Sequence, residues 1–128
     1  MSKRLHAERN EKLSHKLYDE GEFFDWCITT TFYSAIKFIQ HYALPNQYNG
    51  TQCSTLDEFA RAMNLKSETK HKITETLVET ALPSVITEYR WLKDNSYNAR
   101  YHDYDVSQDF AKLAKKFLKK IKDNCPTE

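Results

Sequence analysis

The sequence predicts an all-α fold, an antiparallel up-and-down bundle of four to five helices in a single domain that spans residues 1–128. Structure-breaking residues are rare, because the 128 residues include only two glycines and three prolines. A β-sandwich or barrel needs a turn signal roughly every ten residues, and this chain does not supply them. Between the breakers, apolar residues recur at helical spacing. A chain of this length suits one domain and can bury a core without disulfides or metals.

The spacing of apolar residues places the helices along the chain. The first is expected to stop at Gly21 and the second before Pro45, and Pro83 fits an early position of the fifth. Either Ser54 or Thr55 can cap the third helix. The expected helices cover about residues 3–20, 22–43, 54–64, 67–81, 83–95 and 107–123.

The second of these helices is predicted to lie at the centre of the bundle. Its apolar residues cover most of its circumference, which is typical of a helix surrounded by others. We therefore expect four of its aromatic residues in the core, namely Trp26, Phe32, Tyr33 and Phe38. Charged and polar residues interrupt its apolar run, so it is too polar to span a bilayer.

Two connections are expected to lack helix. Residues 45–54 are typical of a polar loop, with the Asn49–Gly50 pair as a turn signal. Residues 95–107 contain Tyr97, Tyr101 and Tyr104. Because these tyrosines are large and partly apolar, we expect an ordered connection there and not a flexible linker.

Composition argues against several functional classes. The formal net charge of +1 creates no overall field that would draw the protein to nucleic acid or membranes. The three cysteines are scattered and form no C-x-x-C pair, so we expect reduced thiols and no zinc site. The first residues contain no apolar signal-peptide core. These observations predict a cytoplasmic protein that needs no metal or cofactor and does not bind a membrane.

Four segments occur in an order that resembles one known family. They are His6–Asn10, Asp25–Ile36, Tyr89–Tyr101 and the lysine-rich terminal helix. The most specific features are W-x5-FY-x-A in the second segment and L-x6-ARY in the third. On these features the chain is similar to the HEPN family, named for higher eukaryotes and prokaryotes nucleotide-binding, from His6 to about Ile121.

The resemblance implies a bundle of four or five helices that is commonly a homodimer, sometimes beside a small nucleotidyltransferase-type partner. Many HEPN proteins are metal-independent ribonucleases, often toxins, and others are binding or partner modules with a degenerate motif. Active members carry Arg-x4–6-His, which a toxin subgroup extends to Arg-x4-His-x-Tyr. Here His102 and Tyr104 match the end of that motif, but Tyr97 stands where the arginine belongs. The nearest arginines are Arg90 and Arg100.

Metal-free RNA cleavage needs side chains of these types. When the 2′-hydroxyl attacks the phosphate, a base and an acid must move protons, and a cation must meet the developing negative charge. Histidine suits the proton transfers because its unperturbed pKa is about 6.5, and arginine can donate two parallel hydrogen bonds to phosphate. The candidate catalytic residues are therefore His102, Arg100, Arg90 and Tyr104. The alternative for His102 is an ordinary half-exposed loop histidine.

A second pair, Arg9 and His15, also satisfies the motif spacing. Both residues belong to the first predicted helix, where positions six apart point about 120° from each other. That geometry does not converge on one phosphate, and an ordinary solvent-exposed helix face is the alternative.

Basic and aromatic residues near the C-terminus are candidates for ligand binding. The terminal helix offers phosphate contacts, and the tyrosines before it, with Arg90 and Arg100, can form a stacking and phosphate-binding patch. Simpler alternatives exist, because lysines also solvate a helix and favour its C-terminus, and tyrosines also pack at the end of a bundle. The candidates are Lys115, Lys116, Lys119, Lys120, Tyr97 and Tyr101.

Three hypotheses for function follow. The first is a HEPN-like module that binds RNA or nucleotides, as part of a toxin–antitoxin or defence system, with a degenerate catalytic motif. The second is an active metal-independent endoribonuclease. The third is a structural protein-interaction module whose lysines only confer solubility.

Overall fold

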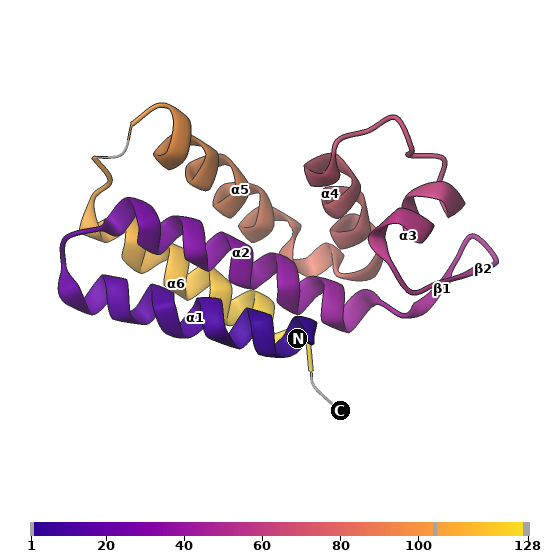
Figure 1. Cartoon of the computed structure of the whole chain (residues 1–128), viewed down its shortest axis with the longest axis horizontal. Coiled ribbons are helices and arrows are strands. Elements are labelled where there is room, and N and C mark those ends of the chain that lie inside the picture. The colour runs from indigo at the N-terminus through magenta and orange to yellow at the C-terminus, as the bar shows by residue number, and fades with distance from the viewer. Residues whose placement is uncertain (1, 104, 127–128) are drawn as a thin grey trace.

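The computed structural model describes residues 2–103 and 105–126 and is mostly helical. In this part of the chain six α-helices pack against one another beside a small hairpin (Figure 1), which confirms the helical class. Their number agrees with the six helical segments placed along the sequence and exceeds the four to five helices expected for the bundle. None of the described helices is long and apolar enough to cross a membrane. The elements are α1 (Lys3–Glu20), α2 (Phe24–Ala43), β1 (Asn46–Tyr48), β2 (Thr51–Cys53), α3 (Leu56–Ala62), α4 (Lys70–Ala81), the short 3-10 helix η1 (Pro83–Val85), α5 (Ile86–Tyr101) and α6 (Gln108–Asp123).

Helix α2 lies at the centre of the fold, as its apolar circumference predicts. It packs against α1, α4, α5 and α6, and its Phe32 and Phe38 are buried as expected. Trp26 and Tyr33 are instead 54% and 41% exposed, so their assignment to the core is wrong. They lie two helical turns apart on one side of α2, and both remain half exposed although Thr29 and Thr30 between them are buried.

Small residues allow α1 and α2 to pack closely as an antiparallel pair. Gly21 ends α1 in the left-handed conformation, with φ of 77°, which costs glycine little. Across the pair, Ser34 Oγ donates to the Ala7 carbonyl at 2.7 Å, and the Cys27 thiol donates to the Ser14 carbonyl at 3.3 Å. All four of these residues are fully buried. The contact therefore joins the two backbones with few side-chain atoms between them.

The expected polar loop after α2 contains a β-hairpin. Strands β1 and β2 are antiparallel, and Tyr48 pairs with Thr51 across a two-residue turn. In that turn Asn49 and Gly50 have φ of 53° and 76°, the left-handed region that tight hairpins require. The Tyr48 ring packs edge-on against Phe59 of α3, with ring centroids 4.9 Å apart. Tyr48 Oη also donates to the Ala43 carbonyl and Asn49 Nδ2 to the Ala62 carbonyl, each at 2.8 Å, so an aromatic contact and two hydrogen bonds anchor the hairpin to the fold.

The helices α3 and α4 lie with this hairpin at the end of the molecule opposite the α1–α2 turn (Figure 1). Thr55, one of the two expected caps, begins α3 in a capping box, because Thr55 Oγ1 accepts from the Glu58 amide and the Glu58 carboxylate accepts from the Thr55 amide. The backbone amides of Ser54 and Thr55, which both donate to the Glu58 carboxylate, hold the pKa of Glu58 below its ordinary value. Helix α4 begins later than expected, at Lys70, after its cap Thr69.

Helix α5 is longer than the sequence predicts. We expected it to fray near residue 95, but it continues to Tyr101, so only residues 102–107 connect it to α6. Ser96 and Ala99, in the unexpected turns, are buried. The Asn95 side chain donates to the Trp91 carbonyl and thereby stays on the helix surface. Packing of the two small residues overrides the weak helix propensity of this segment.

The buried face of α6 provides a test of the core. Leu118 is 1% exposed, and Leu118→Ala is expected to lower the free energy of unfolding by about 2–5 kcal/mol, through lost burial and the cavity that remains. Leu5 of α1 is 56% exposed, so Leu5→Ala is expected to change the free energy of unfolding by no more than about 0.5 kcal/mol. Urea denaturation measures both. Equal effects of the two substitutions would contradict the position of α6.

Candidate functional site

The last two turns of α5 and the facing side of α4 enclose a cleft of about 460 Å³ over α2. Because α5 continues to Tyr101, three residues selected from the sequence line this one cleft, namely Tyr97, Arg100 and His102. Sequence reasoning missed the other basic residues of the lining and the buried residue beneath them. These are His71, Lys72, Lys93 and Phe32.

Two basic residues of the cleft, Arg100 and Lys72, form no salt bridge with any described residue, and of these Arg100 is half-buried whereas Lys72 is exposed. The Arg100 guanidinium donates to Ser96 Oγ and lies over the rings of Tyr33 and Tyr101, at 5.5 and 5.4 Å from their centroids. The Nε of Arg100, although buried, has no acceptor among the described residues. A half-buried cation of this kind, held between aromatic rings, is suited to an anionic ligand.

Glu75 of α4 pairs with two other cations and ties α4 to α5. Its carboxylate accepts from Lys93 Nζ at 2.7 Å and from Arg90 Nε at 3.1 Å, and Arg90 also reaches Glu79 at 3.4 Å. The hydrogen bond from Lys93 is the main reason that the pKa of Glu75 lies below its ordinary value. Glu75 lines the cleft, but Arg90, a candidate catalytic residue, does not. The structure places Arg90 beside the cleft, in the clamp that Glu75 forms with Lys93 and Arg90.

The potential in the cleft is positive at His71. Burial lowers the pKa of His71 below its ordinary value, and the nearby charges of Arg100 and Lys93 lower it further. The ring lies beside Phe32, with centroids 5.7 Å apart. His71 is therefore neutral at pH 7, and one of its neighbours is the unpaired Arg100. The only sequence signal for it was its position one helical turn before Glu75 on α4.

The aromatic residues at the end of α5 form a small exposed cluster. The Tyr97 ring lies 4.9 Å from that of Tyr101 and 5.5 Å from that of His102, centroid to centroid. Tyr97 and Tyr101 are 51% and 66% exposed, which leaves their faces available for stacking. Tyr104, the last candidate catalytic residue, lies outside the described residues.

The candidate lysines of α6 do not share one surface. Lys115, Lys116 and Lys119 line a separate groove of about 720 Å³ between α1 and α6. Lys120 points away from it and pairs with Glu88 of α5 at 3.0 Å. Within the groove, the Lys115 ammonium lies 4.0 Å from the Tyr18 ring centroid, and Lys119 pairs with Asp123 at 2.9 Å. Phosphate binding by these four lysines stays a prediction.

The second motif-like pair does not converge in space. His15 lies 3.8 Å from Glu11 and lines the groove between α1 and α6. Arg9 lines another hollow, with Lys12 and Lys16 on the outer face of α1. The structure thus places the two residues in different surface features.

The cysteines pack as small apolar residues. Cys27, Cys53 and Cys125 are all buried and unpaired. Burial raises the pKa of Cys27 to about 11 and that of Cys125 to about 12, so these two are thiols at neutral pH. Among residues 2–103 and 105–126, no three His, Cys, Asp or Glu side chains are grouped to hold a metal ion.

Comparison with known proteins assigns neither a family nor a function to the chain. No protein-family model, curated protein or solved structure matches the chain. The chemistry of the cleft is therefore what indicates a function.

The charge of Arg100 can be tested through His71. Arg100→Gln is expected to raise the pKa of His71, because one positive charge that opposes protonation is removed. Arg61→Gln removes the same charge from the exposed end of α3 and is expected to have no effect. NMR titration of the histidine ring protons measures both.

The same substitution has a consequence for stability. Because the folded-state pKa of His71 is lowered, protonation favours the unfolded chain, and stability is lost as pH falls from about 6.5 toward the folded pKa. Arg100→Gln is expected to reduce that loss. An unchanged pKa of His71 in Arg100→Gln would contradict the electrostatic coupling.

Proposed function

We propose that this chain binds RNA or nucleotides, with a phosphate group held by Arg100 in the cleft between α4 and α5. One observation carries the proposal: Arg100 lines the cleft half-buried, its buried Nε has no acceptor and it forms no salt bridge in the described structure, whereas Lys93 and Arg90 pair with Glu75. Polar groups in protein interiors are nearly always paired, so a half-buried arginine without an acid indicates a ligand that supplies the anion. Guanidinium and phosphate pair in a fixed, planar geometry.

The aromatic residues of the cleft support a ligand that also carries a base. Tyr97 is half exposed and lines the same cleft as Arg100. Base–aromatic stacking tolerates any base, because every base presents a π face. The cleft volume of about 460 Å³ falls in the range of small-molecule sites.

The resemblance described from the sequence extends this proposal. It supports a HEPN-like up-and-down bundle that acts as a homodimeric, cytoplasmic component of a toxin–antitoxin or defence system, sometimes with a nucleotidyltransferase-type partner. Tyr97 at the position of the motif arginine supports binding without the cleavage typical of the family. Arg100, one helical turn later, supplies the cation at another place in the same segment.

The proposal predicts the effect of one substitution. Arg100→Gln is expected to weaken binding of adenosine 5′-monophosphate (AMP) and of oligoadenylate at least about tenfold, since hydrogen bonds to charged groups contribute about 1.5–3 kcal/mol. Arg61→Gln, which removes an equal charge far from the cleft, is expected to bind as the unchanged protein does. Calorimetry with AMP and anisotropy with labelled oligoadenylate, at one fixed salt concentration, measure the affinities.

Two results would contradict it. Equal affinities of Arg100→Gln and Arg61→Gln would place the phosphate elsewhere on the protein. Absence of binding by the unchanged chain would favour the third hypothesis, a protein-interaction module.

A second function, metal-independent RNA cleavage, is favoured by one specific observation. Two histidines, His71 and His102, line the same cleft as Arg100. The lowered pKa of His71 keeps its ring neutral, as a base that accepts the 2′-hydroxyl proton must be. His102 can protonate the leaving oxygen, and Arg100 can stabilise the charge that develops on the phosphate.

This second function has its own test. Labelled total RNA incubated with the protein and excess chelator is expected to be cleaved, and His71→Ala and His102→Ala are each expected to slow cleavage at least about a hundredfold. Intact RNA with the unchanged protein, or cleavage that survives both substitutions, would exclude this mechanism.

A further inference from the structure

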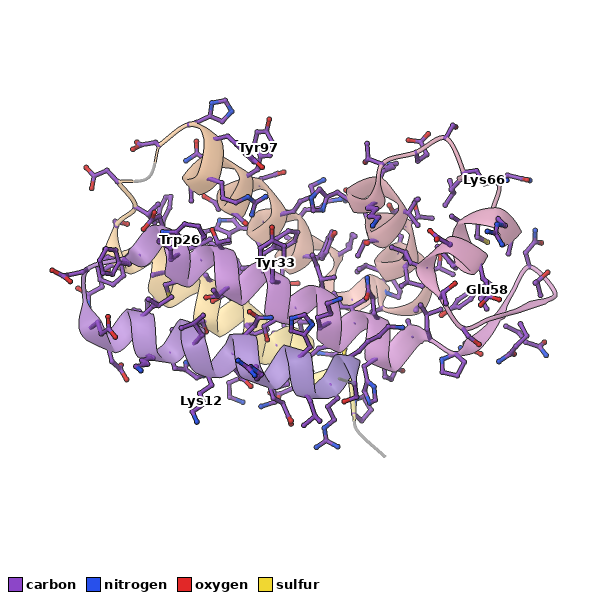
Figure 2. All side chains as sticks on the ribbon, viewed as in Figure 1. Lys12, Trp26, Tyr33, Glu58, Lys66 and Tyr97 are labelled. Carbon is purple, nitrogen blue, oxygen red and sulfur yellow. The ribbon has the colours of Figure 1, made fainter. Side chains whose placement is uncertain are left out.

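Trp26 is a large aromatic residue that the core does not use. It lies in the first turn of α2 and is 54% exposed, whereas the other tryptophan, Trp91, packs edge-on against Phe110 and Phe117. Figure 2 shows Trp26 and Tyr33 along α2 and Tyr97 on α5 above them. These three half-exposed aromatic side chains therefore belong to one side of the molecule.

Trp26 lines a second hollow that adjoins the cleft through Arg100. This hollow has a volume of about 250 Å³, and its lining includes Trp26, Asp25, Tyr101 and Arg100. Arg100 also lines the cleft that contains Tyr97. One guanidinium therefore separates two hollows, each with an exposed aromatic ring.

We propose that the hollow at Trp26 is a second base-binding subsite, so that the ligand is a single-stranded dinucleotide step. This inference rests on the proposed function, because it takes the phosphate on Arg100 as given. One base of the step stacks near Tyr97 in the cleft, and the next base stacks on Trp26. The phosphodiester that joins them lies at Arg100, between the two hollows.

The acidic residue of the hollow favours a base over a second phosphate. The cleft sets three cations against two acids, namely Lys72, Lys93 and Arg100 against Glu75 and Asp94. The hollow at Trp26 is lined by Asp25 and by no described basic residue besides the shared Arg100. A second anion there would therefore meet a carboxylate and no further cation. A carboxylate instead accepts hydrogen bonds from amino groups on base edges. A second phosphate is therefore disfavoured at Trp26, and a base is favoured.

The ligand must also be single-stranded. In a duplex the bases are paired and stacked inside the helix, and their faces cannot reach two separate aromatic rings. Unpaired nucleotides can be splayed apart and stacked on side chains. The arrangement of aromatic rings around one central cation repeats the base–phosphate–base order of a single strand.

The test compares two ligands that differ by one nucleoside. AMP carries a terminal phosphate, and the dinucleoside monophosphate ApA carries a bridging phosphate and a second adenine. The Trp91→Phe protein, checked for folding by circular dichroism, leaves Trp26 as its single tryptophan. We expect ApA to quench Trp26 fluorescence and to bind about tenfold more tightly than AMP, although AMP has the greater negative charge.

Substitutions at Trp26 separate stacking from phosphate binding. Trp26→Ala is expected to remove the advantage of ApA and to weaken AMP binding much less, because AMP has only one base and can place it near Tyr97 in the cleft. Trp26→Phe retains an aromatic face and is expected to keep part of the advantage.

Three outcomes would overturn the inference. If AMP and ApA bind equally and neither quenches Trp26, there is no second subsite, and the proposed function stands. If neither ligand binds, the proposed function fails and the inference fails with it. If Trp26 emission changes with protein concentration alone, together with an increase in mass by light scattering, the surface contacts a second copy of this chain.

Discussion

Burial of α2 is the constraint on which the rest of the structure depends. Four helices pack on it, and residues on almost every side of it are inaccessible to solvent. Its Phe32 ring lies 5.8 Å from that of Tyr89 on α5 and 5.7 Å from that of His71 on α4, centroid to centroid. A helix this apolar cannot be left in water, so its neighbours must surround it. The same ring that holds α4 and α5 to the core underlies the cleft between them.

The buried carboxylate of Glu75 then determines how the cleft is charged. It is 8% exposed and binds Lys93 and Arg90, both from α5. Removal of one partner would leave charge unpaired in a poorly solvated site, which is strongly unfavourable. The clamp joins α4 to α5 and pairs two cations with one carboxylate. Arg100, which no described acid reaches, remains as a half-buried positive charge available to a ligand, beside the exposed Lys72.

Local sequence patterns predicted most helices but neither the hairpin nor the end of α5. Helical spacing located α1, α2 and α6 to within a few residues, because their apolar faces are continuous. The Asn49–Gly50 pair signalled a turn, but the flanking strands have three residues each, too short to show alternation. The extension of α5 depends on burial of Ser96 and Ala99, a tertiary effect that the segment itself does not encode.

The same limit applies to the candidate site. Tyr97, Arg100 and His102 could be selected because a single segment contains them, whereas His71 belongs to another helix and only packing brings it to the cleft. The prediction that Trp26 lies in the core was wrong because apolar residues are often, but not always, buried. An exposed tryptophan is therefore more informative about a binding site than a buried one. When another apolar face covers the exposed surface of Trp26, each Å² of apolar area removed from water is favourable by about 25 cal/mol. A base that stacks there provides such cover, and the phosphate linked to it meets Arg100, a half-buried cation that forms no salt bridge in the described structure.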